Sequence, residues 1–193
     1  MTHTTLAIIS SLLLSLLANL TFATGTAAVD AELRKHLQEA VKDASSFQDK
    51  FDAQVWLVDM SARLKRFVPD DKQRLQLLKS VHREATRAGL KPELVLSVIQ
   101  IESHFDRYAV SRVGAQGIMQ VMPFWKNEIG RAEDNLIDLD TNLRYGCTIL
   151  AYYLNKEKGD LVDALARYNG SLGKTKYPEK VLVAWENRWF TNN

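Results

Sequence analysis

One glutamate lies where a general acid would be needed. Apolar residues recur at helical spacing after Pro92, and Glu102 shares their face near the expected C-terminal end of the helix. Burial and the negative end of the helix dipole both disfavour an ionised carboxyl group, so we expect the pKa of Glu102 to be raised. That tuning suits an acid that donates a proton near neutral pH. Position alone leaves open a second interpretation, in which Glu102 reaches solvent or pairs with an arginine.

Three short motifs follow one another after this glutamate. They are I-E-S-H-F-D at 101–106, S-R-V-G-A-Q-G-I-M-Q-V-M-P at 111–123 and A-R-Y-N-G at 166–170. Three ordered motifs are far more specific than any one of them alone. Together they resemble the soluble lytic transglycosylase family of peptidoglycan-cleaving enzymes, whose fold is similar to that of goose-type lysozymes. The resemblance covers about residues 75–189.

The resemblance implies a role for several individual residues. Glu102 would be the sole catalytic acid/base, with Ser103 helping to shape the end of its helix. The tyrosine of the third motif, Tyr168, would bring its hydroxyl close to the catalytic carboxyl group. The residues expected to bind substrate are Ser111, Gln120, Met122, Tyr168 and Asn169.

The implied substrate is the glycan strand of peptidoglycan. Protonated Glu102 would donate to the glycosidic oxygen of the β-1,4 bond between N-acetylmuramic acid and N-acetylglucosamine. The resulting carboxylate would accept the proton of the muramic acid C6 hydroxyl as that oxygen attacks C1, which gives a 1,6-anhydro end. One carboxylate suffices because the nucleophile belongs to the substrate. We expect neither a cofactor nor a metal, since the four histidines have no ligand spacing and Cys147 is the single cysteine.

Two other functions stay open at this point. A lysozyme-like muramidase would need a second carboxylate to activate water, and Asp106 or Asp140 would have to supply it. A non-catalytic peptidoglycan-binding module would have kept only the cleft. The aromatic residues Phe124 and Trp125 fit stacking on sugar rings and covering of the core equally well.

The sequence departs from the family pattern around the third motif. Arg167 takes the place of a small residue, and Gly170-Ser171-Leu172-Gly173 replaces a Gly-Pro-Gly run. We therefore expect the loop after Asn169 to have another shape. Arg167 would either add positive charge for the acidic peptide stems of peptidoglycan or pair with a nearby carboxylate.

Helices must position these residues, because helical periodicity runs through the chain and no alternating strand pattern is found. The fold predicted is all-α, a lysozyme-like helical domain with an N-terminal amphipathic helical extension. The helical segments expected are 29–66, 70–89, 92–102, a short helix within 111–122, 140–159, 160–170 and the C-terminal stretch through Trp189. In the first segment the apolar face is expected at Leu33, Leu37, Val41, Ala44, Phe47, Phe51, Val55 and Val58.

The remaining features concern organisation and location. A chain of 193 residues suggests one domain plus an appendage, and a net charge of +2 is too even for a nucleic-acid partner. The apolar run from Leu6 to Leu20 predicts a secretory signal with cleavage after Ala28, although an uncleaved anchor is an alternative because the first five residues lack Lys and Arg. We therefore divide the chain into a signal (1–28), a helical accessory segment (29–68) and a catalytic domain (69–193).

These features predict an exported, periplasmic protein with no stable membrane anchor. Its expected partner is the peptidoglycan glycan strand. The sequence identifies no wall-remodelling or secretion-machine partner.

Overall fold

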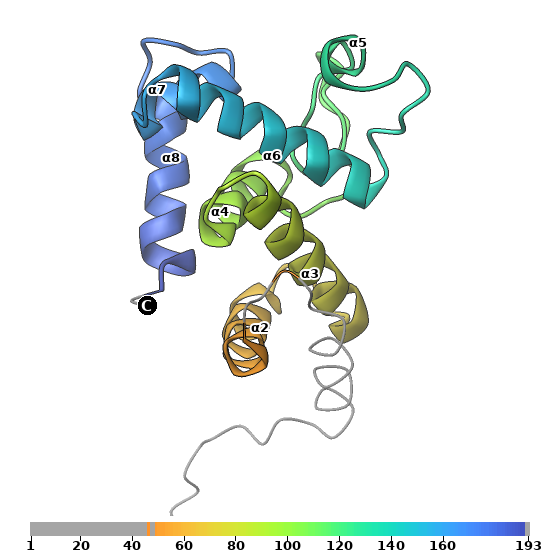
Figure 1. Ribbon diagram of the computed structural model, residues 1–193, viewed down its shortest axis with the longest axis vertical. Helices are drawn as coiled ribbons and strands as arrows, with labels where there is room; N and C mark the ends of the chain where they lie inside the picture. The colour runs from red at the N-terminus through yellow and green to blue at the C-terminus, as the bar shows by residue number, and fades with distance from the viewer. Residues whose placement is uncertain (1–45, 47–48, 192–193) are drawn as a thin grey trace, which may run out of the picture.

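The computed structural model describes Ser46 and residues 49–191, and within them the regular structure is helical (Figure 1). This confirms the all-α prediction. The helices are α2 (Lys50–Leu64), α3 (Asp71–Arg87), α4 (Pro92–Ser103), α5 (Trp125–Ile129), α6 (Leu139–Lys156), α7 (Leu161–Tyr168), α8 (Lys176–Ala184) and the π-helix η1 (Trp185–Trp189). The expected signal and about half of the accessory segment (29–45, 47 and 48) lie outside the described residues, so the proposed division of the chain stays a prediction.

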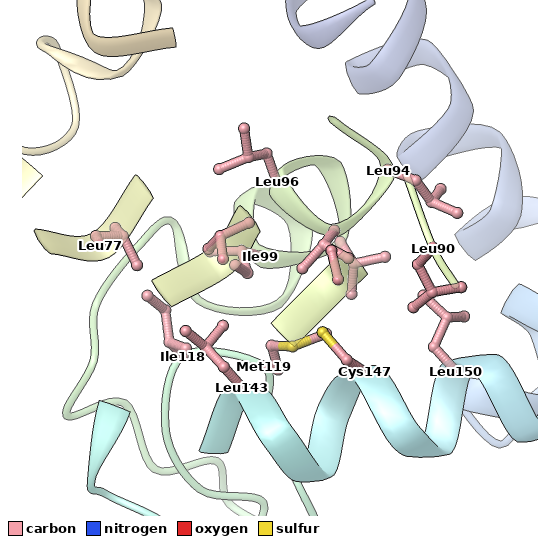
Figure 2. Close-up of a cluster of buried hydrophobic side chains, with 14 of the residues drawn as sticks. Leu77, Leu90, Leu94, Leu96, Ile99, Ile118, Met119, Leu143, Cys147 and Leu150 are labelled. Carbon is pink, nitrogen blue, oxygen red and sulfur yellow. The ribbon is translucent and has the colours of Figure 1, made fainter. Parts of the chain in front are cut away.

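Helix α4, which carries the candidate acid, lies in the middle of the fold. It contacts α3 on one side and α8 with η1 on the other (Figure 1). Every residue from 94 to 99 is buried, as expected for a helix surrounded by neighbours. Figure 2 shows Leu96 and Ile99 of α4 among the core side chains, with Met119 and Cys147 approaching from the 117–120 turn and from α6. Packing of apolar side chains in the core therefore holds α4 in position, without a contribution from the candidate site residues.

The predicted ends of α3, α4 and α7 are confirmed. Asp70 caps α3 by accepting a hydrogen bond from the backbone N–H of Gln73 at 2.7 Å, and Asp160 caps α7 in the same way. Pro92 occupies the first turn of α4, as expected from its fixed φ. His104 ends α4 in the left-handed region at φ 54°, so the chain turns away two residues after Glu102.

The predicted short helix within 111–122 is wrong. Residues 117–120 form a turn with Gly117 at φ 74° and Gln120 at φ 51°, and isolated β-bridges join Gln116 to Val110 and to Val121. A short helix, α5, begins only after Pro123. The glycines of this segment have positive φ and mark a tight turn rather than the entrance to a helix.

The side chain of Asn142 on α6 holds this turn. Its Oδ1 accepts from the backbone N–H of Met119 at 2.8 Å, while its Nδ2 donates to the carbonyls of Gln116 at 2.8 Å and Leu136 at 2.7 Å. Gly117 leaves room for this contact, because a Cβ there would lie 2.4 Å from both the Leu136 carbonyl and Asn142 Nδ2. A buried amide thus satisfies backbone groups that a helix would have satisfied internally.

Helix α2 packs on α3 and η1 with a face other than the predicted one. Phe51 and Val55 are 72% and 49% exposed. The buried residues are Ala53, Trp56, Leu57, Met60 and Leu64, which also recur at helical spacing. The predicted face continued the helical spacing of the apolar residues that precede Phe51. The sequence of α2 contains a second apolar pattern, and the packing on α3 and η1 buries that one.

Helix α6 begins at Leu139, one residue before the predicted segment 140–159. Asp138 caps it by accepting from the backbone N–H of Thr141 at 3.0 Å, so Asp140, the first residue of the predicted segment, is not the cap. Asp140 instead accepts from the Ser80 hydroxyl at 2.6 Å and pairs with Arg83 at 2.8 Å. None of the helices in the described part of the chain is both long and apolar enough to cross a membrane.

Candidate active site

Glu102 lies in the last turn of α4, partly buried, with a single side-chain partner. The hydroxyl of Tyr177, in the first turn of α8, donates to its Oε1 at 2.6 Å. Burial raises the pKa of Glu102 to about 7, and the hydrogen bond from Tyr177 opposes that rise. No cation among the described residues forms an ion pair with Glu102, so the alternative of an arginine-paired glutamate is not what the structure shows. The pKa of Glu102 is thus raised in the direction that the sequence analysis predicts.

The carboxyl group of Glu102 opens into a surface cavity of about 340 Å³. Its walls come from the end of α4, the loop after α7 and the beginning of α8, and Figure 1 shows α7 and α8 at one side of the fold next to α4. The cavity is lined by Ile101, Glu102, Asn169, Ser171, Lys174, Lys176, Tyr177 and Lys180. Glu102 is the one carboxyl group in this lining, so a ligand that fills the cavity meets a single acid.

Tyr168 lies close enough to Glu102 to be affected by its charge, but its hydroxyl does not donate a hydrogen bond to that carboxyl group. Its hydroxyl donates to the backbone carbonyl of Met119 at 2.8 Å, which ties α7 to the 117–120 turn. Burial, reinforced by the nearby Glu102, raises the pKa of Tyr168 well above its ordinary value, so the phenol stays a donor. The tyrosine that reaches the acid is Tyr177, which the sequence analysis did not identify. It lies outside all three motifs, and only the packing of α8 on α4 brings it to Glu102.

The serine and glutamine of the second motif build its loop. The Nε2 of Gln120 donates to the carbonyls of Ala109 at 3.1 Å and Gly117 at 2.9 Å. Ser111 Oγ accepts from the backbone N–H of Ala115 at 3.0 Å. Both side chains therefore stabilise the segment 109–121, and neither they nor Met122 line the cavity at Glu102. Their predicted contacts with substrate stay predictions.

Two other expected residues lie close to the acid. Asn169 lines the cavity and donates from Nδ2 to Ser171 Oγ at 3.0 Å. Ser103 donates to the carbonyl of Ile118 at 2.7 Å, which joins the end of α4 to the turn of the second motif, as its expected shaping role requires. The structure thus brings together Glu102 and Asn169 of the predicted set and adds Tyr177.

The rival carboxylates have local roles. Asp106 Oδ1 accepts from the backbone N–H of Tyr108 at 2.9 Å, a turn contact, and Asp140 is engaged by Ser80 and Arg83 as described above. Neither lines the cavity at Glu102. Within the described part of the chain, no cluster of histidine, cysteine, aspartate and glutamate side chains could hold a metal ion.

The two aromatic residues after Pro123 differ in their exposure to solvent. Trp125 is partly buried and packs against the core, whereas Phe124 is 54% exposed, and their rings stack with centroids 5.0 Å apart. They line a separate cavity of about 500 Å³ together with Tyr152 and Tyr153. Trp125 therefore covers the core and also lines this cavity, while Phe124 has the larger exposed surface.

The fold and the site define an all-α domain that presents one protonatable carboxyl group in an open cavity. Residues 79–181 match the family model described as Transglycosylase SLT domain. The chain belongs to this family, which confirms the resemblance carried by the three motifs.

Individual relatives agree with the family match. The chain is 32% identical over 119 residues to the membrane-bound lytic murein transglycosylase C of Yersinia pestis (strain Pestoides F) and, equally, to that of Yersinia pseudotuberculosis serotype O:1b (strain IP 31758). Each match covers 53% of this chain and 33% of the relative. The chain therefore spans about a third of the length of these relatives. A solved structure, an inactive mutant of the lytic transglycosylase Slt from Pseudomonas aeruginosa, matches with 23% identity and a TM-score of 0.45, covering 75% of this chain and 31% of that one.

Proposed function

We propose that this protein is a peptidoglycan lytic transglycosylase with Glu102 as its single acid/base. The substrate bond is the β-1,4 linkage between N-acetylmuramic acid and N-acetylglucosamine, and the product carries a 1,6-anhydromuramic acid end. The observation that carries the proposal is a carboxyl group with its pKa raised to about 7, exposed to a cavity and present in an SLT-family chain. The names of the relatives, lytic murein transglycosylases, support the same substrate.

The geometry of Glu102 and Tyr177 supports both halves of the proposed reaction. Glu102 Oε1 is held by the Tyr177 hydroxyl, so Oε2 is the oxygen available to carry the proton and donate it to the glycosidic oxygen. Cleavage of the C1–O bond leaves an electron-poor C1, and the C6 hydroxyl oxygen of the same sugar attacks it. The carboxylate accepts the proton released from that hydroxyl, so Glu102 returns to its starting form. Tyr177 stabilises the intervening carboxylate because its O–H donates to the charged oxygen.

The alternatives have less structural support. A muramidase needs a second carboxylate near the cavity, and Asp106 and Asp140 both lie outside its lining. A binding module has no use for a partly buried, protonatable glutamate, since removing a carboxyl group from solvent without an ionic partner is costly. The alternatives predict different outcomes, because a muramidase would release reducing ends and a binding module would release no fragments. One experiment therefore distinguishes them from the proposed function.

Export to the periplasm belongs to the proposal as well. The apolar run from Leu6 to Leu20 supports a secretory signal, and glycan strands lie outside the cytoplasm. Burial raises the pKa of the Cys147 thiol to about 12, which keeps the single cysteine unreactive in an oxidising compartment. Expression of the full chain fused to alkaline phosphatase tests the location, because this reporter is active only after export.

The decisive test of the activity is mass spectrometry of fragments released from purified peptidoglycan. We expect muropeptides one water lighter than hydrolysis products from the wild-type protein and none from the Glu102→Gln variant. Glu179→Gln is the matched control, because Glu179 lies in the first turn of α8 but outside the cavity lining. Full-mass reducing ends would establish a muramidase instead, and binding without release by the wild-type protein would establish a binding module.

A further inference from the structure

Three lysines surround the cavity into which Glu102 opens. Lys174 belongs to the loop after α7, and Lys176 and Lys180 lie on α8. The two on α8 are four residues apart, which places their side chains on the same face of the helix. Three positive charges therefore converge on a cavity whose lining contains a single acidic group, Glu102.

These charges have no partner in the structure. Within residues 49–191 none of the three lysines forms an ion pair. The one acidic residue between positions 170 and 180 is Glu179, which does not line the cavity. By contrast, Arg167, the cation singled out by the sequence, is paired with Glu157 and so is not available to a ligand. Pairing with a carboxylate, one of the two roles expected of Arg167, is therefore the one that the structure shows, and the cations near Asn169 are lysines.

The lysines do not serve Glu102 either. Its pKa rises to about 7 because of burial, and the hydrogen bond from Tyr177 is the opposing influence. Ammonium groups close to the carboxylate would have lowered that pKa. All three side chains are exposed, so they lie at the rim of the cavity and face whatever occupies it. Unneutralised cations at the rim indicate an anionic ligand group.

We infer that Lys174, Lys176 and Lys180 bind carboxylates on the muramic acid side of the substrate, an inference that rests on the proposed function. The C6 hydroxyl that attacks C1 belongs to muramic acid, so this sugar must lie beside Glu102. The sugar rings are neutral, and the negative charge of the strand is carried by the lactyl substituent of muramic acid. Two sources share this chemistry: the carboxylates of an attached peptide stem, and the lactyl carboxylate itself where the stem has been removed.

Binding measured without turnover tests the inference. The Glu102→Gln protein is titrated calorimetrically with a glycan tetrasaccharide that carries peptide stems, with the same tetrasaccharide after removal of the stems, and with neutral chitotetraose. The same titrations are made with a Glu102→Gln protein that also carries the substitutions K174Q/K176Q/K180Q. The matched control is K65Q/K72Q/K158Q, which removes three other exposed lysines that do not line this cavity.

We expect the lysine variant to bind the anionic ligand about tenfold more weakly than the control does, since three rim contacts of modest strength act together. Chitotetraose should bind both variants equally. Raising the salt concentration should weaken binding of the anionic ligand to the control and have little effect on the lysine variant. A loss confined to the stem-bearing ligand assigns the stem carboxylates, and a loss confined to the stem-free ligand assigns the lactyl carboxylate.

Three results would overturn the inference: equal weakening for chitotetraose, no difference between the two triple variants, or no binding of any ligand. The proposed function is judged separately, by anhydro ends released from peptidoglycan by protein with an intact Glu102. That release can persist in the lysine variant at high substrate concentration even if the inference fails. The two failures are therefore distinguishable.

Discussion

Two glutamates on neighbouring helices show how one residue type takes opposite properties. Glu84 on α3 is completely buried and meets three arginines, at 3.2 Å from Arg83, 2.7 Å from Arg87 and 3.2 Å from Arg144. Burial would raise its pKa, but the hydrogen bonds from these arginines outweigh burial and leave the pKa below its ordinary value. Glu102 on α4 has only the neutral Tyr177, so burial prevails and its pKa rises to about 7.

The difference teaches that burial by itself does not identify a catalytic acid. Glu84 has the less solvent-accessible side chain of the two, yet its lowered pKa keeps it an anion at neutral pH, and it joins α3 to α6 through Arg144. Glu102 is less buried and can exchange its proton, because no cation stabilises its charge and a cavity gives access to it. Two properties therefore distinguish the candidate acid Glu102 from the structural Glu84: Glu102 has no cationic partner among the described residues, and a cavity makes its carboxyl group accessible.

The sharpest way to test this contrast is to neutralise each glutamate in turn. Glu102→Gln should lower the rate of anhydro-muropeptide release by about 1,000-fold or more, because it removes the proton donor while keeping the shape of the side chain. Glu84→Gln should leave the rate per folded molecule near that of the wild type. Initial rates on purified peptidoglycan measure both, with far-UV circular dichroism to count folded protein. Comparable losses of activity per folded molecule in the two variants would contradict the assignment of Glu102 as the acid and Glu84 as a structural residue.

Stability should respond in the reverse order. Glu84→Gln should lower the free energy of unfolding by about 3 kcal/mol, because it leaves three arginines facing a neutral amide in a buried position. Urea denaturation measures the change. Glu133→Gln is the control, since Glu133 pairs with Arg131 where both side chains are at least 70% exposed, and such a pair contributes little. If Glu84→Gln costs no more than this control, the arginine cluster does not hold α3 to α6.

The pH dependence of stability should have opposite signs at the two sites. The pKa of Glu102 is raised in the folded state, so its contribution to stability is present below about pH 4.5 and is lost as the pH rises through about 7. Glu102→Gln should therefore be more stable than the wild type at pH 8 by about 3 kcal/mol and equal to it near pH 4. Thermal unfolding at several pH values measures this. A difference that does not change with pH would contradict the raised pKa.

The opposite sign is expected at Glu84. Its pKa is lowered in the folded state, so its contribution is present above the unfolded pKa and is lost as the pH falls through the folded pKa. The difference between wild type and Glu84→Gln should therefore shrink in acid.

The smallest expected effect concerns Tyr177. Tyr177→Phe removes the hydrogen bond that stabilises the carboxylate of Glu102, so we expect about a tenfold lower rate at neutral pH. The activity should fall as the pH rises through about 7 in the wild type, because the proton donor is lost, and this decline should move to higher pH in the variant. Tyr168→Phe is the comparison, since its hydroxyl bonds Met119 and should leave the midpoint of the decline unchanged. Rates measured from pH 5 to 9 decide which tyrosine tunes the acid.

The parts of the fold that local signals specify were predictable. Asp70 and Asp160 are N-caps, Pro92 starts a helix, and apolar residues at helical spacing surround Glu102 because a helix repeats every 3.6 residues. These features depend on neighbours within a few residues, which a sequence displays directly. The choice of Glu102 rested on such a local pattern and on the three ordered motifs.

The features that were missed depend on distant partners. Two apolar patterns run through residues 50–64, and the packing of α2 on α3 and η1 selects the one that contains Trp56. Asn142 lies 23 residues beyond Met119, yet its side-chain amide provides hydrogen bonds to the backbone of the 117–120 turn that the predicted helix would have made internally. Tyr177 lies 75 residues beyond Glu102 and donates the hydrogen bond to its carboxyl group, which no motif of the sequence indicated.

The sequence by itself determined the helices α3, α4 and α7, the caps Asp70 and Asp160, and the one glutamate suited to acid catalysis, because each is encoded by residue types at short spacing. Tertiary structure decided which tyrosine donates to that glutamate, which face of α2 is buried, and that lysines rather than Arg167 surround the cavity. The physical reason is that pKa values and ligand contacts depend on groups brought together through space. Their order along the chain does not show which groups will meet.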